Sequence, residues 1–458
     1  MTADHRTSTT EEPGADGGSG TYAEVVDLLS RLIRFDTTNW GRGTSAGERE
    51  AATWVAARLE SVGWAPRLLA RDDAPDRANV VLRVPGMRHE LPALLVHAHL
   101  DVVPAEADDW SVDPFGGQVS DGYVWGRGAV DMKDMCAMTL ATLLRWGREG
   151  VRPQRDVVVA FVADEEDQGA YGARWLAEAH PELFDGVEAA IGESGGMFRR
   201  LERGDKSVRC YPIAAAERRS LHLRLTARGV AGHASRPGPT TAVSRLVDAL
   251  HRLAHHPWPI HLSPAVRAQL QGTADALGVP VDLDTAAGVQ ACLDELGPMA
   301  DVARFTVRAQ TTPTMLSAGY KVNVLPATAT AEVDVRCPPG YAEQLEAMLP
   351  ELIGDEVEWE HTAHSLPVSA PVDGPWFAAM RDAVCAADPG AVVFPYCMGG
   401  GTDAKAFAPL GIAGYGFAPL GEDPDGRLAE GVHGVDERVP VASLLWGLQV
   451  LDDFLTRA

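Results

Sequence analysis

Residues 94–104 of this 458-residue chain form an apolar run that leads into histidine and aspartate. Side chains on a β-strand alternate between two faces. Every second residue from Leu94 to Leu100 is apolar, so these side chains share one face, and the other face carries His97, His99 and Asp101. A buried strand that ends in an imidazole, with a carboxylate two residues on, suits a metal ligand and the partner that orients it. The alternative is a core histidine whose hydrogen bond is satisfied by a local aspartate.

Two further apolar runs also predict buried strands that deliver carboxylates at their ends. Residues 156–163 are followed by Asp164, Glu165 and Glu166, and residues 187–192 are followed by Glu193. Near-continuous apolar runs are typical of parallel strands buried on both faces, and ligand sites in open α/β sheets form outside the carboxyl ends of the strands. With amphipathic helices between them, these runs predict an α/β domain.

A second kind of pattern begins near residue 219. Apolar and polar residues alternate in 220–227 and 327–336, as in an antiparallel sheet with one solvated face. The α/β pattern resumes near residue 366. The segment from about 256 to 320 fits no simple pattern, so its elements are not predicted.

These patterns predict three parts of the chain. Residues 1–20 contain almost no large apolar side chain and are expected to be a disordered tail. Residues 21–218 and 366–458 are expected to form one discontinuous α/β domain, and residues 219–365 an inserted α+β domain. Two or three domains are also what a chain of this length requires.

Charge and cysteine usage limit the partners and the compartment. The chain has 40 basic and 64 acidic residues, a formal net charge of −24. Nucleic acids and anionic membranes attract basic surfaces, so neither is an expected partner. No apolar run approaches the roughly 20 residues that span a bilayer. The six cysteines are widely scattered, which predicts reduced thiols in a cytoplasmic protein.

Six residues that follow predicted strands or lie in glycine-rich turns have metal-binding or proton-carrying side chains. They are His99, Asp131, Glu165, Glu166, Glu193 and His433. Zinc binds histidine nitrogen and carboxylate oxygen, and two metals about 3.5–4 Å apart need a bridging ligand. Two imidazoles and three carboxylates are enough for such a pair and leave one carboxylate as a general base for water attack. Each residue alone has an ordinary explanation as a turn, a cap or a surface group, and only their conjunction predicts a two-metal site.

Nine stretches, in the same order along the chain, resemble the zinc-dependent peptidase and amidohydrolase family of aminoacylases, acetylornithine deacetylases, succinyl-diaminopimelate desuccinylases, glutamate carboxypeptidases and dipeptidases. They are HAHLDVVP (97–104), GRGAVDMKD (126–134), DEE (164–166), GES (192–194), GVAGHASRPG (229–238), KVNVLP (321–326), DVR (334–336), GGTDA (400–404) and HGVDER (433–438). The resemblance implies a mixed, mainly parallel sheet with helices on both faces, and an inserted lid and dimerisation domain with an antiparallel sheet.

The resemblance also implies which residues hold the metals. His99 and Glu193 would bind one zinc, Glu166 and His433 the other, and Asp131 would bridge the two ions. The peptide bond after Asp131 would be cis. His97 is an additional imidazole that the family does not use, and we expect it to pack or to form a hydrogen bond.

Further roles follow from the same resemblance. Asp101 would orient His99, and Glu165 would be the general base. His233 would stabilise the oxyanion in the site of a neighbouring subunit. The residues at family positions that bind the carboxylate or carbonyl of the substrate are Asn323, Arg336, Gly401 and Thr402.

We therefore predict a homodimeric two-zinc hydrolase that cleaves an amide bond next to a free carboxylate, in a dipeptide or an N-acyl amino acid. Cobalt or manganese would also suit a carboxylate-rich site. One alternative is a two-metal ester or phosphoester hydrolase, for which Arg127 and Lys133 would supply positive charge. The other is a non-catalytic, metal-dependent binding protein, which the presence of every ligand and of the base disfavours.

Overall fold

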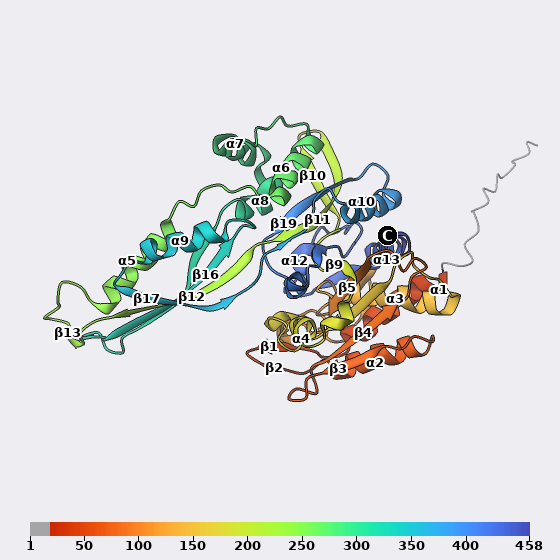
Figure 1. Cartoon of the computed structure of the whole chain (residues 1–458), viewed down its shortest axis with the longest axis horizontal. Helices are drawn as coiled ribbons and strands as arrows, with labels where there is room; N and C mark the ends of the chain where they lie inside the picture. The colour runs from red at the N-terminus through yellow and green to blue at the C-terminus, as the bar shows by residue number, and fades with distance from the viewer. Residues whose placement is uncertain (1–18) are drawn as a thin grey trace, which may run out of the picture.

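The computed structural model describes residues 19–458 and has two lobes (Figure 1). The larger lobe contains a ten-stranded sheet, and the elongated smaller lobe contains a four-stranded sheet. The predicted tail, residues 1–20, lies outside the described residues except for its last two, where helix α1 (Ser19–Ile33) begins. Within the described residues, no helix is long and apolar enough to cross a membrane.

The ten-stranded sheet follows the order β10-β11-β20-β9-β5-β8-β4-β3, with β18 and β19 paired to β11. The central pairings, β20 with β9, β9 with β5, and β5 with β8, are parallel. Most outer pairings are antiparallel. The strands of this sheet are β3 (Arg67–Ala70), β4 (Ala78–Val84), β5 (Ala93–His99), β8 (Val157–Val162), β9 (Val187–Gly192), β10 (Arg199–Arg203), β11 (Lys206–Glu217), β18 (Val368–Ser369), β19 (Val392–Met398) and β20 (Ala413–Gly416).

Helices cover both faces of this sheet, as the sequence predicts. Leu94 and Val96 of β5 belong to a core shared with α1, α3 and α13, whereas Leu95 packs with Leu176 of α4 and Phe407 of α11. The alternation of strand side chains thus divides β5 between two hydrophobic layers. The helices of this lobe are α2 (Arg49–Glu60), α3 (Lys133–Glu149), α4 (Ala173–Ala179), α10 (Pro375–Ala387), α11 (Ala404–Phe407), α12 (Leu428–Gly431) and α13 (Val441–Arg457).

The four-stranded sheet is antiparallel throughout, in the order β14-β16-β12-β17. On β12, Leu221, Leu223 and Leu225 are buried, and the residues between them are partly or fully exposed. This confirms the predicted sheet with one solvated face. Its elements are β12 (Arg219–Arg228), β14 (Gln310–Ala318), β16 (Thr328–Cys337) and β17 (Val357–His364), covered by α5 (Ala242–His255) and α9 (Ala342–Ile353).

The segment that the sequence pattern leaves unassigned is mostly helical. It contains α6 (Pro264–Leu277), α7 (Ala286–Leu296) and α8 (Asp301–Thr306). Leu270 of α6 belongs to the same core as Phe394 of β19, so these helices pack on the larger sheet although the chain enters them from the smaller lobe. The domain limits at 218/219 and 365/366 therefore remain a proposal, although the chain does pass from β11 to β12, and so between sheets, at residue 218.

Short elements complete the fold. They are β1 (Asn39–Gly41), β2 (Thr44–Ser45), β6 (Val119–Ser120), β7 (Tyr123–Trp125), β13 (Gly232–His233), β15 (Val324–Leu325) and β21 (Arg438–Pro440), with 3-10 turns η1 (Ala107–Asp109), η2 (Glu165–Asp167), η3 (Pro181–Phe184), η4 (Gly297–Ala300) and η5 (Ala408–Leu410).

Candidate metal centre

The carboxyl ends of the central strands bring the predicted ligands together. His99 is the last residue of β5, Glu193 directly follows β9, and Glu166 lies in η2, just after β8. The loop before α3 adds Asp131, and the loop before β21 adds His433. The ligand atoms form two groups, each within 4.8 Å, and both groups include Asp131. The groups are His99, Asp131 and Glu193, and Asp131, Glu166 and His433.

Asp131 lies between the two histidines. Its Oδ1 is 3.1 Å from Nε2 of His99, and its Oδ2 is 3.0 Å from Nε2 of His433. The outer carboxylates are near the same nitrogens, with Glu193 Oε2 3.9 Å from His99 and Glu166 Oε1 3.3 Å from His433. One carboxylate that presents an oxygen to each group is the arrangement that a bridging ligand needs. The peptide bond between Asp131 and Met132 is cis.

The electrostatics of these five residues favour added positive charge. Burial opposes the charged form of His99, but hydrogen bonds with Asp131 and Glu193 hold its pKa well above the usual range. Hydrogen bonds with Asp131 and then Glu166 raise the pKa of His433 to about 10. Glu166 Oε1 is also buried, and His433 Nε2 lies 3.3 Å from it. A donor set of two imidazoles and three carboxylates that attracts positive charge fits divalent cations such as zinc.

The Asp101 carboxylate contacts the turn that carries Glu165 and Glu166 more closely than it contacts His99. Its two oxygens accept hydrogen bonds from the backbone N–H groups of Glu165 and Glu166, both at 3.1 Å. His99 Nδ1 forms its hydrogen bond with the backbone carbonyl of Asp101 at 2.9 Å, and the nearest carboxylate oxygen is 3.6 Å away. The carbonyl is therefore the group that fixes the His99 tautomer, because the carboxylate satisfies turn N–H groups that would otherwise lack acceptors.

Glu437 supports the loop that carries Asp131. It is completely buried and pairs with Arg127 at 2.6 Å. Its carboxylate also accepts hydrogen bonds from the backbone N–H groups of Gly128, Val130 and Asp131, at 2.8–3.1 Å. The motif HGVDER contains this residue, but nothing in the motif predicts its contacts. One side chain thus connects the loop of His433 to the loop of Asp131.

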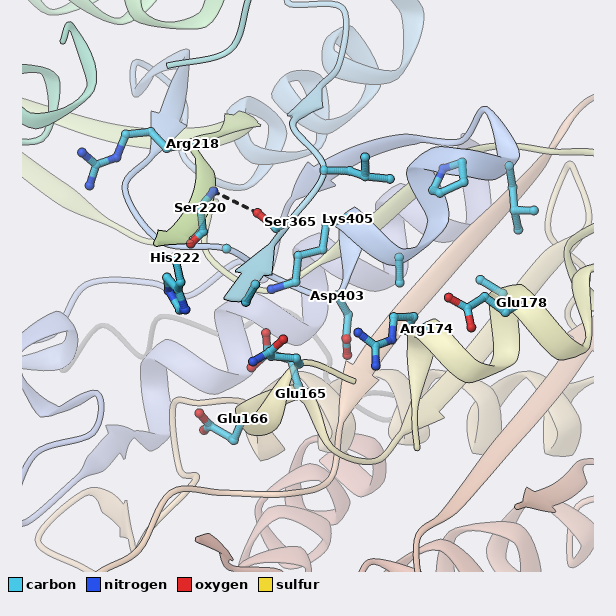
Figure 2. A pocket seen from close by; sticks show the side chains of 18 of the residues that line it. Glu165, Glu166, Arg174, Glu178, Arg218, Ser220, His222, Ser365, Asp403 and Lys405 are labelled. Atoms are coloured by element: carbon cyan, nitrogen blue, oxygen red, sulfur yellow. Dashed lines mark hydrogen bonds between the residues drawn. The ribbon is translucent and has the colours of Figure 1, made fainter. Parts of the chain in front are cut away.

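A cavity of about 380 Å³ opens next to the metal centre, between the two lobes. Figure 2 shows Glu165 and Glu166 on one side, Arg218, Ser220 and His222 on another, and Asp403 and Lys405 between them. Burial, followed by the negative charges of Glu193 and Asp403, raises the pKa of Glu165 well above its usual range. A carboxylate with a raised pKa at the edge of a cavity is suited to proton transfer.

Three of the four residues predicted to contact substrate lie at the cavity. Arg336 and Gly401 line the cavity. Thr402 is buried beside it, and both its backbone N–H and its hydroxyl donate to Glu217.

Two other predicted site residues lie elsewhere. His233 and Asn323 are exposed on neighbouring segments, where the N–H of Ala234 donates to the Asn323 carbonyl at 3.0 Å. Both segments lie near β13 and β15, at the end of the smaller lobe furthest from β5 and β9 (Figure 1). The chain therefore does not bring His233 and Asn323 to its own cavity.

His97 is part of the core. Its ring is 1% exposed and lies 5.4 Å from the ring of Phe407. Neither ligand group includes it.

Several polar side chains that line the cavity were not indicated by the sequence pattern. Among them are Arg174, His222, Asp403 and Lys405. Asp403 stands inside the GGTDA stretch, and Lys405 follows that stretch directly, so the motif could have indicated both. Nothing in the local pattern distinguishes Arg174 on α4 or His222 on β12 from ordinary surface residues.

Comparison with known sequences places the chain among amide hydrolases. It is 28% identical over 431 residues to the N-fatty-acyl-amino acid synthase/hydrolase PM20D1 of Xenopus tropicalis, covering 91% of this chain and 82% of the relative. It is 27% identical over 390 residues to human aminoacylase-1, covering 82% of each protein.

A solved structure shows the same fold, and a family profile agrees with the sequence comparison. An M20 family metallo-carboxypeptidase from Sulfolobus solfataricus, Sso-CP2, has the same fold, with a TM-score of 0.69 at 15% identity over 94% of this chain and 98% of that one. Residues 95–457 match the family described as peptidase family M20/M25/M40. The chain belongs to the M20/M25/M40 peptidase family and is a hydrolase of amide bonds.

Proposed function

We propose that this protein is a two-zinc hydrolase that cleaves an amide or peptide bond next to a free carboxylate. The observation that carries the proposal is the position of Asp131, which presents one oxygen to His99 and the other to His433. In this proposal His99 and Glu193 hold one ion, Glu166 and His433 hold the second, and Asp131 bridges them. Bound zinc would polarise the scissile carbonyl and lower the pKa of a water towards about 7.

Glu165 is the residue that we propose as general base. It borders the cavity and directly precedes the proposed ligand Glu166. Its carboxylate would accept a proton from the attacking water and donate it to the leaving nitrogen. The raised pKa of Glu165, which follows from burial and from the nearby charges of Glu193 and Asp403, supports this role because the carboxyl must hold the proton between the two steps.

The cavity supports a dipeptide or an N-acyl amino acid as the substrate. The Nε of Arg336 donates to Asp334 at 2.9 Å, and within the described residues its two terminal nitrogens have no partner and can bind a carboxylate. Apolar side chains, including Leu366 and Leu410, line another part of the cavity and could contact an acyl group or side chain. The relatives named for N-acyl amino acid chemistry support the same class.

We also propose that the protein is a homodimer and that the part of residues 219–365 built on the four-stranded sheet acts as its lid. Strand β14 is an edge strand, and Met315 and Leu316 on it are 61% and 63% exposed. Tyr320 and Val322, on the segment after β14, are 85% and 98% exposed. A long edge strand with exposed apolar residues is typically covered by another chain. A partner bound there would also explain the position of His233, which lies too far from the cavity of its own subunit to act there.

The phosphoester alternative gains no support from the cations that it needs. Arg127 is paired with Glu437, and Lys133 is completely buried, with its Nζ donating to the Phe35 carbonyl at 2.9 Å. Neither side chain is available to a phosphate. The proposed cytoplasmic location rests on the cysteines, all six of which are free thiols.

The first experiment measures release of free amine from dipeptides and from N-acetyl, N-succinyl, N-carbamoyl and long-chain N-acyl amino acids. Metal-stripped protein would be compared with protein given zinc, cobalt or manganese. We expect metal-dependent cleavage of one substrate class. Cleavage that needs no metal would contradict the proposal, as would no cleavage by protein that is folded and binds two metal ions.

The Glu165→Gln variant tests the proton carrier separately. We expect it to bind two metal ions and to lose about 10²–10⁴-fold in kcat. Glu178→Gln is the matched control, because Glu178 lines the same cavity from α4 but is assigned no role in the reaction. Near-normal turnover by Glu165→Gln would show that another group carries the proton.

A further inference from the structure

A set of buried polar side chains lies behind the metal centre and has no part in the chemistry proposed above. Its members, here called the Asn39 network, are Asn39, Glu48, Arg77, Asp101 and Asp164, each at most 6% exposed. The network holds three carboxylates and one guanidinium, and the guanidinium of Arg77 binds two of them, Glu48 and Asp164. Buried charged groups are costly unless they are paired and hydrogen-bonded, so the contacts that satisfy them determine where each carboxylate lies.

Asn39 joins two of these carboxylates. Its side-chain nitrogen lies 2.9 Å from Asp101 Oδ2 and 3.2 Å from Asp164 Oδ1. An amide nitrogen has two N–H donors, so it can serve both carboxylates at once. Without it, two buried like charges would face each other, which disfavours the ionised form of both. The side-chain oxygen of Asn39, Oδ1, accepts a hydrogen bond from Gly41 N at 3.0 Å, which fixes the orientation of the side-chain amide.

Arg77 and Glu48 hold the other side of Asp164. Arg77 Nη2 donates to Asp164 Oδ1 at 2.7 Å, and Arg77 also binds Glu48 through two nitrogens at 2.8–2.9 Å. The second oxygen of Asp164 accepts the N–H of Tyr171 at 3.1 Å. Asp164 therefore cannot move without breaking several buried contacts.

Asp101 and Asp164 hold the turn that carries Glu165 and Glu166. Asp164 precedes Glu165 in the chain, and Asp101 accepts the backbone N–H groups of Glu165 and Glu166. Asp101 also follows β5, two residues after His99. Asn39 thus connects the turn after β8 to the end of β5.

The segment around Asn39 makes the same connection through its backbone. The Asn39 N–H donates to the Val102 carbonyl at 2.8 Å, on the side of β5. On the side of the turn, Gly43 N donates to Asp167 Oδ2 at 3.0 Å. Residues 39–43 therefore contact both parts of the site, and Asn39 is where the two sets of contacts meet.

We infer that Asn39 is a positioning residue that fixes Glu165 and Glu166 relative to His99. The inference rests on the proposed function, because it assigns Asn39 an effect on the metal site that Glu166 shares with His433. Partners that orient metal ligands typically contribute 10–100-fold to metal affinity or activity. Loss of the Asn39 amide should therefore weaken the Glu166 site and leave the His99 and Glu193 site intact.

The test is the Asn39→Asp variant, which keeps the shape of the side chain and replaces its N–H donors with an oxygen. It places a third carboxylate against Asp101 and Asp164. We expect one of the two zinc equivalents to bind 10–100-fold more weakly in equilibrium dialysis, and the other to bind as in the wild type. With substrate, kcat should fall by a similar factor, and KM should change little.

Two further variants separate positioning from stability. Asn39→Ser keeps one hydroxyl donor, so it should fold and give an intermediate loss of zinc affinity even if Asn39→Asp does not fold. Ser443→Ala is the matched control, because it removes a buried side-chain hydrogen bond of 2.9 Å, to the Gly421 carbonyl, at the start of α13. The control should lower the unfolding midpoint without changing either zinc affinity.

The possible results distinguish the inference from the proposed function. If both Asn39 variants bind two zinc ions with wild-type affinity and differ only in stability, as the Ser443 control does, the inference is wrong and the proposed function stands. If the wild-type protein binds fewer than two zinc ions, the proposed function fails and the inference fails with it. An equal loss of affinity for both zinc ions would also contradict the inference, since the inference assigns the loss to the Glu166 site.

Discussion

Replacement of Gly192 by alanine should destabilise the protein by crowding the ring of His97. Gly192 is the last residue of β9, and His97 lies on β5, the neighbouring strand. A Cβ atom at position 192 would lie 2.2 Å from Cε1 of His97 and 2.5 Å from its Nε2. Carbon atoms pack best at about 3.5–4.0 Å, so the added methyl group overlaps the ring by more than 1 Å.

The structure leaves few ways to relieve this overlap. His97 is 1% exposed and packs against Phe407, so the ring has no open space to enter. Both strands are in the centre of the ten-stranded sheet, which prevents them from separating. Overpacking of a core costs typically 1–3 kcal/mol, and we expect Gly192→Ala to lie near 3 kcal/mol. His97→Ala alone should cost about 2 kcal/mol through the space that it leaves.

Urea unfolding of the metal-free protein tests this reasoning with a double-mutant cycle. In the Gly192→Ala/His97→Ala protein the new methyl group enters the space of the lost ring, so the two costs should fall short of additivity by about 2 kcal/mol. Gly238→Ala is the control, because among the described residues its added Cβ would meet nothing nearer than the Thr240 carbonyl oxygen at 3.8 Å. A cost below 0.5 kcal/mol for Gly192→Ala, roughly that of a neutral surface change, would refute the argument, as would full additivity.

Three further predictions follow from the site. Glu437→Gln removes the charge that pairs with Arg127 and should weaken zinc binding about 10-fold in calorimetric titration; unchanged affinity would show that the loop of Asp131 needs no such support. Burial raises the pKa of Glu217 from 4.5 to about 7, so the folded protein keeps a proton that the unfolded chain releases, and stability should fall as pH rises through this window. The loss is at most about 3 kcal/mol, and Glu217→Gln should abolish it in urea unfolding at pH 5 and pH 7.5. If His233 acts in the partner subunit, a mixture of inactive His233→Ala and Glu165→Gln proteins should recover about a quarter of wild-type activity, since half of the dimers then hold one complete site; a mixture as inactive as its components would count against a shared site.

The fold of the larger lobe follows from patterns that the sequence displays directly. The run at 187–192 is β9 without any shift in its limits, and 156–163 contains β8. Such runs are informative because a strand buried on both faces has almost no polar residues to confuse its pattern. The same logic located the site, since parallel strands end at one edge of a sheet and bring the residues that follow them together.

The helices between residues 264 and 306 show the limit of this reasoning. Ser263 caps the start of α6 by accepting a hydrogen bond from Val266 N, and Gly278 ends the helix in a left-handed conformation. Both signals were present in the sequence. They mark where a helix starts and stops, but they do not say which sheet it covers. The packing of α6 on β19, across the limit between the two lobes, therefore needed the structure.

Polar side chains inside the protein were hardest to predict, and they are the ones that build the site. Asn39 and Arg77 are polar and belong to no apolar periodic pattern, so the sequence gives no reason to place them in the interior. They are buried because the turn after β8 exposes backbone N–H groups that Asp101 must accept, and because that carboxylate then needs donors of its own. Each partner creates the need for the next. Such a chain of hydrogen bonds connects residues far apart in sequence, here 39 with 101 and 164, and only the folded structure reveals it.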